Sequence, residues 1–266
     1  MTVPSDSSEA PNYAELRKRA RLRLLRMHFE AGVGHIGGNL SALDALLVLH
    51  HRIMTPDDVF ILAKGHAAGA LYIALWSRGE IGEDELRTFH GDDSRLSGHP
   101  APAALAGIPV ATGSLGHGLP VSAGIALARK LDAAPGRVFC LCSDGEWQEG
   151  SNWEALIFAA KHELKSLVLL VDVNGLQGFG TTAEVGGIDN LAERFESFGF
   201  STSECDGHDA AEMAAELERD VPGPRAILLH TVKGKGVSFM ENELASHYVP
   251  LGDAEFAKAC AEVERG

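Results

Sequence analysis

The segment RVFCLCSDGEWQEGSNWEALIFAAKHELKSLVLLVDVNG, residues 137–175, decides the fold class. It begins with an apolar segment at 137–142 and ends with another at 167–173, and the pattern between them predicts a helix over 152–162. Strands that are apolar at nearly every position are typical of a parallel sheet covered on both faces. We therefore predict an α/β fold, with a doubly wound, mostly parallel sheet and helices on both faces.

The rest of the chain continues this alternation and shows no linker or internal repeat, so residues 12–266 are predicted to form one domain after a disordered tail at 1–11. Residues 89–115 are rich in Gly, Pro, Ser and Asp and are expected to form a long loop, and loops of this length are usually either functional or disordered. Two further helices are expected to begin at the N-cap Ser41 and at about Asp253. Other helices are expected at 13–31, 65–79, 117–131, 190–198 and 209–219, and further strands at 59–62, 200–205 and 226–230.

The overall charge and hydropathy exclude two classes of partner. The chain has 37 acidic and 23 basic residues, a formal net charge of −14, whereas nucleic-acid binding needs a basic surface. No apolar run approaches the roughly 18–20 residues of a membrane-spanning helix. The basic, amphipathic segment 15–30 contains acidic residues and lacks a cleavage site, so we interpret it as a structural helix rather than a targeting peptide.

The four cysteines form no C-x-x-C pair, and no set of histidines has zinc-ligand spacing. Cys140 and Cys142 alternate with apolar residues along one predicted strand, which indicates buried, reduced thiols. We therefore expect a reducing, cytoplasmic location.

Two polar dipeptides follow the strands of the 137–175 unit. Asp144-Gly145 ends the first strand and Asn174-Gly175 ends the second, so both side chains are expected at one edge of the sheet, where open α/β sheets bind ligands. Carboxylate, amide and backbone carbonyl oxygens suit Mg²⁺ or Ca²⁺, and the Gly145 N–H is expected to be open to an anion. Either dipeptide alone is a common turn, so the remaining segments must decide.

The pair Asp144-Gly145 with Asn174 resembles the thiamine diphosphate motif, with Ser143 in place of its usual first glycine. Six segments resemble transketolase, in transketolase order and over nearly the whole chain: GHIGGNLS (34–41), KGHAAGALY (64–72), SGHP (97–100), TGSLGHG (112–118), DGEWQEGSNWEA (144–155) and VKGKGVSFMEN (232–242). What they resemble is the N-terminal, diphosphate-binding domain. Full-length transketolases are more than twice this long, so the resemblance implies the N-terminal subunit of a split transketolase.

The resemblance also implies a cofactor site. Asp144, Asn174 and the main-chain carbonyl of Leu176 would hold Mg²⁺ (or Ca²⁺ as a substitute) against thiamine diphosphate, and Gly145 would donate its N–H to a phosphate oxygen. The loop residues Gly113, Leu115 and Gly116 would pack against the rings of the cofactor.

Four histidines match functional histidines of the family. His66 and His247 would contact the diphosphate or line the entrance beside it, whereas His35 and His99 would act as catalytic residues that orient substrate hydroxyls near the reacting carbon. A separate set sits within predicted helices and is interpreted as surface or satisfied packing residues without a functional role: His28, His50, His51 and His162.

The activity implied is transfer of a two-carbon glycolaldehyde unit from a ketose, with phosphorylated sugars as the first expectation, to an aldose. In the family a glutamate of the pyrimidine-binding domain activates the cofactor, so this chain alone should be inactive and should need a partner carrying the pyrimidine-binding and C-terminal domains. Glu149 and Glu154 match residues near the dimer axis, which implies self-association into a two-plus-two heterotetramer. Ordinary acidic residues at a helix start are the alternative explanation.

Two departures from the family bear on the substrate. His90 replaces an arginine of the substrate channel, which indicates a different or unphosphorylated sugar unless Arg95 compensates, and His117 replaces a glutamine. Alternatives remain open: a 1-deoxyxylulose-phosphate synthase, the α subunit of a 2-oxoacid dehydrogenase, an enzyme of a specialised sugar pathway, or a non-catalytic cofactor-binding partner subunit.

Overall fold

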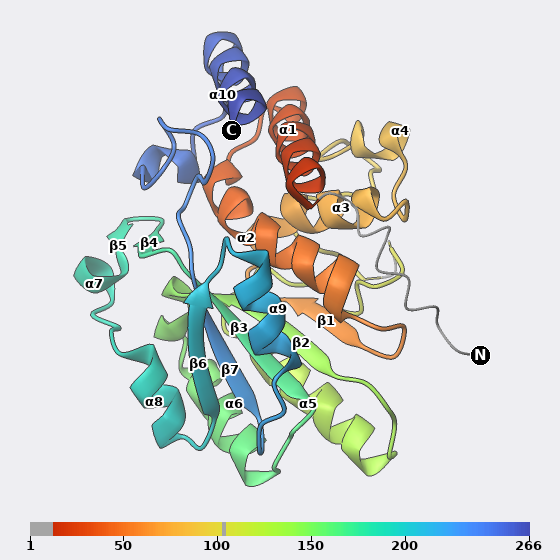
Figure 1. Cartoon of the computed structure of the whole chain (residues 1–266), viewed down its shortest axis with the longest axis vertical. Helices are drawn as coiled ribbons and strands as arrows, with labels where there is room; N and C mark the ends of the chain where they lie inside the picture. The colour runs from red at the N-terminus through yellow and green to blue at the C-terminus, as the bar shows by residue number, and fades with distance from the viewer. Residues whose placement is uncertain (1–12, 103–104) are drawn as a thin grey trace.

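A five-stranded parallel sheet forms the centre of the protein, whose computed structural model describes residues 13–102 and 105–266. Its strand order is β1-β2-β3-β7-β6 (Figure 1). The predicted α/β class is confirmed, whereas the predicted tail at 1–11 lies outside the described residues. The strands are β1 (Val59–Leu62), β2 (Val138–Ser143), β3 (Leu167–Val173), β6 (Ser201–Asp206) and β7 (Arg225–His230).

Helices cover both faces of the sheet and enclose two hydrophobic cores. Successive side chains of a strand point to opposite faces, so Phe139 and Leu141 of β2 enter one core while Cys140 and Cys142 enter the other as buried free thiols. The first core contains α1 (Tyr13–Ala31), α2 (Ile36–Val48), α3 (Ala68–Ser77), α9 (Ala210–Glu218) and α10 (Asp253–Arg265), and the second contains α5 (Gly118–Leu131), α6 (Gly150–Lys161) and α8 (Leu191–Ser197).

The start of α2 corrects one prediction. Ser41 was expected as its N-cap, but the helix begins at Ile36 after His35, which has the left-handed φ of 62°. Gly37 is required inside the helix because a neighbour comes too close for a side chain: a Cβ there would lie 2.2 Å from Ser246 Oγ. Ser41 is fully buried and donates to Asp172 Oδ2 at 2.6 Å.

The carboxyl ends of all five strands meet at one edge of the sheet. From this edge extends a hairpin of β4 (Leu176–Gln177) and β5 (Gly180–Thr181), followed by α7 (Thr182–Val185), at the left of Figure 1. The short α4 (Glu83–Leu86) precedes a loop that contains no helix or strand in its described part, as predicted for 89–115. The strand ends and this loop supply the site described below.

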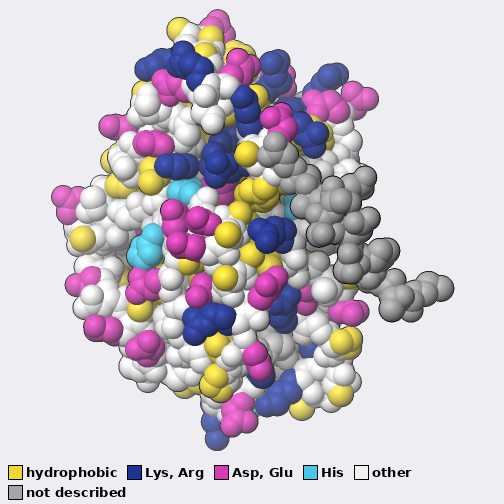
Figure 2. Space-filling model, in the orientation of Figure 1, with side chains coloured by type: hydrophobic (Ala, Val, Ile, Leu, Met, Phe, Trp, Pro, Cys, Tyr) yellow, Lys and Arg dark blue, Asp and Glu magenta, His cyan; other side chains and the backbone are white. Residues whose placement is uncertain are grey.

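The exposed surface is of mixed charge. Figure 2 shows Asp and Glu side chains interspersed with Lys and Arg on one face, so the net negative charge is not gathered there into a single acidic patch. Among the helices of residues 13–102 and 105–266, none combines the length and the apolar character that crossing a membrane requires.

Candidate active site

A cavity of about 300 Å³ lies at the carboxyl ends of β2 and β3. Gly116 is the one predicted site residue that does not line it; its backbone N–H instead donates to the buried Glu146 at 3.0 Å, behind the cavity wall. The structure therefore brings together segments that are up to 212 residues apart (247 − 35) in the sequence. The predicted residues that line the cavity are His35, His66, His99, Gly113, Leu115, Asp144, Gly145, Asn174, Leu176 and His247.

Asp144 is held by three backbone hydrogen bonds. Its Oδ2 accepts the N–H of Asn174 at 2.9 Å and of Gly175 at 2.6 Å, and its Oδ1 accepts the N–H of Gly145 at 2.7 Å. The Gly145 N–H, expected to be open to an anion, is therefore already paired with the preceding carboxylate in this structure. These bonds fix the carboxylate relative to the turn that carries Asn174 and Leu176.

The oxygen atoms at this position suit a divalent cation. Burial, together with the nearby Asp172 carboxylate, raises the pKa of Asp144 to about 6, which shows that its negative charge is poorly compensated by the protein. Asn174 Oδ1 and the carbonyl of Leu176 lie in the same wall of the cavity. Hard oxygen donors beside an under-compensated carboxylate fit Mg²⁺ better than a soft metal.

Four histidines surround the cavity with His35 at their centre. The ring centroid of His35 lies 6.0 Å from that of His66, 6.3 Å from that of His99 and 5.1 Å from that of His247. Burial lowers the pKa of His35 and His99 and lowers that of His66 well below its ordinary value. Burial and the Lys233 ammonium lower the pKa of His247 to about 4. All four imidazoles are therefore neutral at pH 7 and can donate or accept hydrogen bonds from hydroxyl groups.

The position of His99 depends on Gly113. A Cβ on Gly113 would lie 2.7 Å from the imidazole ring of His99, and Gly113 has a φ of 133°, which an L side chain rarely adopts. On its other side, the Gly113 backbone lies against Gly65, directly before His66. The predicted loop residue thus sets the spacing between two of the site histidines.

Lys233 is the main site residue that the sequence patterns did not indicate. Its Nζ lies 3.3 Å from the carbonyl oxygen of Leu176 and donates to Nδ1 of His247 at 2.8 Å. Burial and the neighbouring Lys64 lower the pKa of Lys233 to about 8. A lysine three residues after the end of a strand and directly before Gly234 is a signal that could have indicated it.

Beneath the cavity, Asp172 connects several of the strand ends. It is buried beside Lys64, with which it forms an ion pair, and its Oδ1 accepts from Asn174 Nδ2 at 3.3 Å. Lys64, Ser41 and Thr231 hold the pKa of Asp172 below its ordinary value despite the burial that would raise it. Asn174 Oδ1 accepts the backbone N–H of Leu176 at 3.1 Å, and because an amide oxygen has two lone pairs it can still accept or ligate once more.

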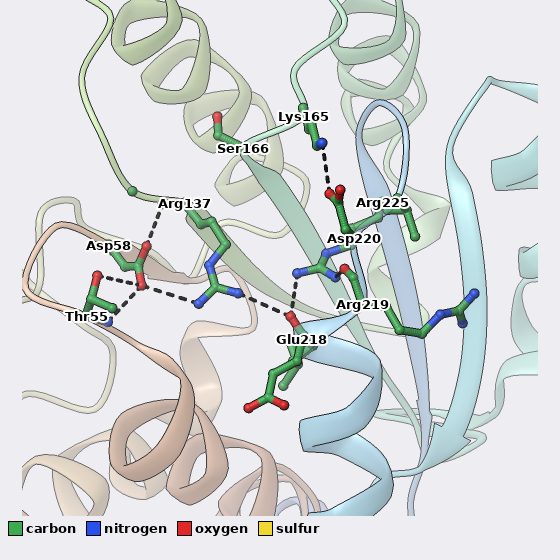
Figure 3. Close-up of a pocket in the computed structure, with 12 residues that line it drawn as sticks. Thr55, Asp58, Arg137, Lys165, Ser166, Glu218, Arg219, Asp220 and Arg225 are labelled. Carbon is green, nitrogen blue, oxygen red and sulfur yellow. Dashed lines mark hydrogen bonds and ion pairs between the residues drawn. The ribbon is translucent and has the colours of Figure 1, made fainter. Parts of the chain in front are cut away.

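A larger cavity, of about 610 Å³, lies at the opposite ends of the strands and is an alternative candidate site (Figure 3). Its cationic side chains are already used by the protein. Arg137 and Arg225 donate to the Leu217 carbonyl at 3.2 and 2.7 Å, at the carboxyl end of α9, and Lys165 pairs with Asp220 at 2.8 Å. This arrangement is that of a helix C-cap rather than an anion site.

The residues expected at the channel and at the interface lie outside the cavity lining. His90 packs its ring against Gly98, whose Cβ would lie 2.1 Å from His90 Nε2. Arg95 pairs with Glu85 at 2.5 Å. The exposed His117 precedes α5, and Glu149 and Glu154 are exposed at the start of α6, where their predicted interface role stays a prediction.

The side chains of three histidines without an assigned role have partners. His28 bonds Leu24 O at 3.2 Å, His51 bonds Ser77 Oγ at 2.8 Å, and the ring of His162 packs against that of Phe158, with centroids 4.5 Å apart. The expectation of a surface or satisfied residue is wrong for His50, because its side chain is buried and its Nε2 has no partner among the described residues.

The sequence of residues 17–263 matches the family model described as "Transketolase, thiamine diphosphate binding domain". The chain belongs to the transketolase family. This transketolase domain is 38% identical over 259 residues to an apulose-4-phosphate transketolase subunit of Actinobacillus succinogenes, covering 91% of this chain and 94% of that protein. It is 37% identical over 246 residues to a 6-deoxy-6-sulfo-D-fructose transketolase subunit of Clostridium sp. (strain MSTE9), covering 88% of this chain and 90% of that protein.

Solved transketolases share the fold. The transketolase of Campylobacter jejuni superposes with a TM-score of 0.83 at 30% identity, over 94% of this chain and 42% of that one. The transketolase of Leishmania mexicana superposes with a TM-score of 0.87 over 96% of this chain and 42% of that one. Its sequence identity of 24% supports the fold alone. This transketolase domain therefore spans about two fifths of the length of the solved enzymes, but nearly the whole length of relatives named as subunits.

Proposed function

We propose that this protein is the N-terminal subunit of a two-chain transketolase, which uses thiamine diphosphate and Mg²⁺ to transfer a two-carbon ketol unit from a ketose to an aldose. One observation carries the proposal: the oxygen ligands of Asp144, Asn174 and Leu176 line the same 300 Å³ cavity as His35 and the other site histidines. A cation site beside neutral imidazoles is what a diphosphate cofactor and a polyhydroxylated substrate require together.

In this proposal, Asp144 Oδ atoms, Asn174 Oδ1 and the Leu176 carbonyl hold Mg²⁺. His66, His247 and the Lys233 ammonium, which line the same cavity, bind the oxygens of the diphosphate. Ca²⁺ can replace Mg²⁺ because the donors are all oxygens. Thiamine diphosphate, when bound, supplies the nucleophilic carbon to which the two-carbon unit is transferred.

His35 and His99 act on the substrate. Their rings are neutral at pH 7, as the lowered pKa of each indicates, so each can hydrogen-bond a sugar hydroxyl without adding charge to the site. A hydrogen bond from an imidazole N–H would stabilise the ketose carbonyl oxygen, which gains negative charge when that carbonyl is attacked. Gly113 and Leu115 form the wall beside them, which the rings of the cofactor would contact, and Gly116 supports this wall from behind.

The partner is proposed to be the chain that carries the pyrimidine-binding domain. The names of two relatives support this, since both are named as subunits and are covered over 90% or more of their length. Phe179 and Tyr248 leave 85% and 52% of their surface exposed at the cavity, which suits a covering protein surface. A cytoplasmic two-plus-two assembly with Glu149 and Glu154 near its axis completes the proposal.

A non-standard sugar is the second candidate, favoured by the surroundings of His90. Its ring lies close to the site, where it helps to lower the pKa of His99 after the larger effect of burial, and Arg95 is paired with Glu85. The names of two relatives, which refer to apulose 4-phosphate and to 6-deoxy-6-sulfo-D-fructose, also support an unusual sugar as the substrate.

The experiment compares the chain alone with the chain plus the transketolase C-terminal half encoded nearest to it. Calorimetry measures binding of thiamine diphosphate with Mg²⁺, and a two-carbon transfer assay uses xylulose 5-phosphate, apulose 4-phosphate and 6-deoxy-6-sulfo-D-fructose as donors. Transfer only in the mixture supports the proposal, and the donor used distinguishes the two candidates. Cofactor binding without any transfer by the mixture would favour a non-catalytic role, and no cofactor binding would exclude both.

A further inference from the structure

We propose that the buried Asp44 and its partly buried hydrogen-bond partner His208 position Lys233 in the cofactor site. The inference rests on the proposed function, in which the Lys233 ammonium binds the diphosphate. Neither residue lines the cavity, so each acts through the backbone of the segment that carries Lys233.

Asp44 forms the fixed end of this arrangement. It lies in α2, is fully buried, and its Oδ2 accepts from Arg21 Nη2 at 2.5 Å and from His208 Nδ1 at 2.8 Å. Its backbone carbonyl accepts from the hydroxyl of Tyr13 at 3.1 Å. A carboxylate paired with a guanidinium and bonded to an imidazole cannot move without leaving buried charges unpaired, so Asp44 is a rigid anchor.

His208 transmits the position of Asp44 to the chain before Lys233. Its Nε2 accepts the backbone N–H of Val232 at 2.9 Å. A backbone N–H can only donate and an ionised carboxylate can only accept, so the proton of the imidazole must be on Nδ1, facing Asp44. The pair thus selects one tautomer, and that tautomer presents an acceptor to Val232.

The segment 231–234 has further backbone restraints. Thr231 donates its N–H to Val173 O at 3.0 Å, Gly234 donates to Gly37 O at 3.0 Å, and the Lys233 carbonyl accepts from the N–H of Asn242 at 2.9 Å. Together with these restraints, the bond from Val232 to His208 sets the direction in which the next side chain, Lys233, leaves the backbone. That direction brings its Nζ to the Leu176 carbonyl.

The test variant is His208→Asn. The amide Nδ2 of asparagine occupies the position of imidazole Nδ1 and can still donate to Asp44, whereas no atom reaches Val232. The variant therefore keeps the buried carboxylate paired and removes one bond. The matched control is His230→Asn, since His230 is the last residue of β7, is about half exposed, and pairs with the similarly exposed Glu204 at 2.5 Å. Thermal unfolding confirms that both variants are folded.

Calorimetry with Mg²⁺ and inorganic pyrophosphate, and with Mg²⁺ and thiamine diphosphate, is carried out on the full chain. We expect His208→Asn to weaken both affinities about fivefold, the effect of one ordinary hydrogen bond, with His230→Asn unchanged. In a Lys233→Met background the same substitution should have less than about a twofold effect, because the residue through which it acts is gone. Hydrogen–deuterium exchange of a peptide containing residues 231–234 should be faster in His208→Asn than in the parent chain, and it should be unchanged in the control His230→Asn.

Three outcomes would overturn the inference: unchanged affinity in His208→Asn, an equal loss in the Lys233→Met background, or unchanged exchange of segment 231–234. Failure of the proposed function looks different. In that case the parent chain itself binds neither pyrophosphate nor thiamine diphosphate, while the exchange measurement still decides whether His208 holds the segment.

Discussion

The Asp144 carboxylate accepts the backbone N–H of Asn174 at 2.9 Å, across 30 residues of sequence. The two proposed cation ligands are therefore joined directly by the protein. This bond exists because β2 and β3 are adjacent and parallel, with Ser143 in register with Asp172, so the residue after each strand emerges at the same edge. Pre-positioned ligands reduce the entropy that cation binding must overcome.

Asp144→Asn should therefore abolish most of the Mg²⁺-dependent binding of thiamine diphosphate. Removing the only charged ligand of the proposed set is expected to lower the affinity for Mg²⁺ by about 100-fold or more. Calorimetry at pH 7.5 measures the effect. Asp132→Asn, an exposed change at the end of α5, is the control and should bind normally. Normal Mg²⁺ affinity in Asp144→Asn would rule out this residue as a ligand.

The pH dependence of Mg²⁺ binding should follow Asp144. Burial raises its pKa to about 6 from 3.8, so the carboxylate is mostly ionised at pH 7 and mostly protonated at pH 5. Since the cation needs the ionised form, Mg²⁺ affinity should fall about tenfold between these pH values.

The stability of the metal-free chain should change in the opposite direction. A carboxyl group whose pKa is raised in the folded state holds a proton that the unfolded state releases, so the contribution of Asp144 to the free energy of unfolding increases as pH falls from 7 towards 4. Denaturant titrations of the parent chain and of Asp144→Asn isolate this contribution. A pH-independent difference between the two would contradict the assignment.

Lys233→Met should weaken the binding of pyrophosphate and of thiamine diphosphate without unfolding the protein. The methionine retains much of the buried aliphatic chain but removes the charge, and a charged hydrogen bond of this kind corresponds to about a tenfold to 100-fold change in affinity. Lys235→Met is a closely matched control, because Lys235 is two residues away, partly exposed, and pairs with Glu241 at 3.8 Å. Equal effects of the two substitutions would point to general electrostatics rather than a specific contact.

Gly113→Ala should displace His99. The added Cβ would meet the imidazole ring at 2.7 Å, and the φ of 133° is strained for alanine, so a loss of about 1–3 kcal/mol in the free energy of unfolding is expected. Transfer activity should fall more than cofactor affinity. Gly124→Ala on α5 has open space around its Cβ and should be neutral or slightly stabilising. Retained activity in Gly113→Ala would show that His99 can adjust.

The sequence allowed the edge of the sheet to be predicted because local patterns determine it. Two apolar strands joined by one helix place Asp144 and Asn174 together when the strands are neighbours in a parallel sheet, as consecutive strands usually are. Lys233 could not be predicted in this way, since its contacts with Leu176 and His247 require β7 to insert beside β3, and no local pattern states the strand order. Ser41 was misassigned because close packing against Ser246 makes Gly37 a good helix residue, which is a tertiary effect.

The backbone conformation of His35 lowers the free energy of unfolding of the protein. Its φ of 62° is one that glycine adopts freely and other residues only at about 1–2 kcal/mol, and its N–H is bound to the carbonyl of His247. His35→Gly should therefore have a higher free energy of unfolding than His35→Ala by about 1 kcal/mol, as measured by denaturant titration. A sequence optimised only for stability would be expected to have glycine at this position, and it would then lack the imidazole that the proposed function assigns to the substrate.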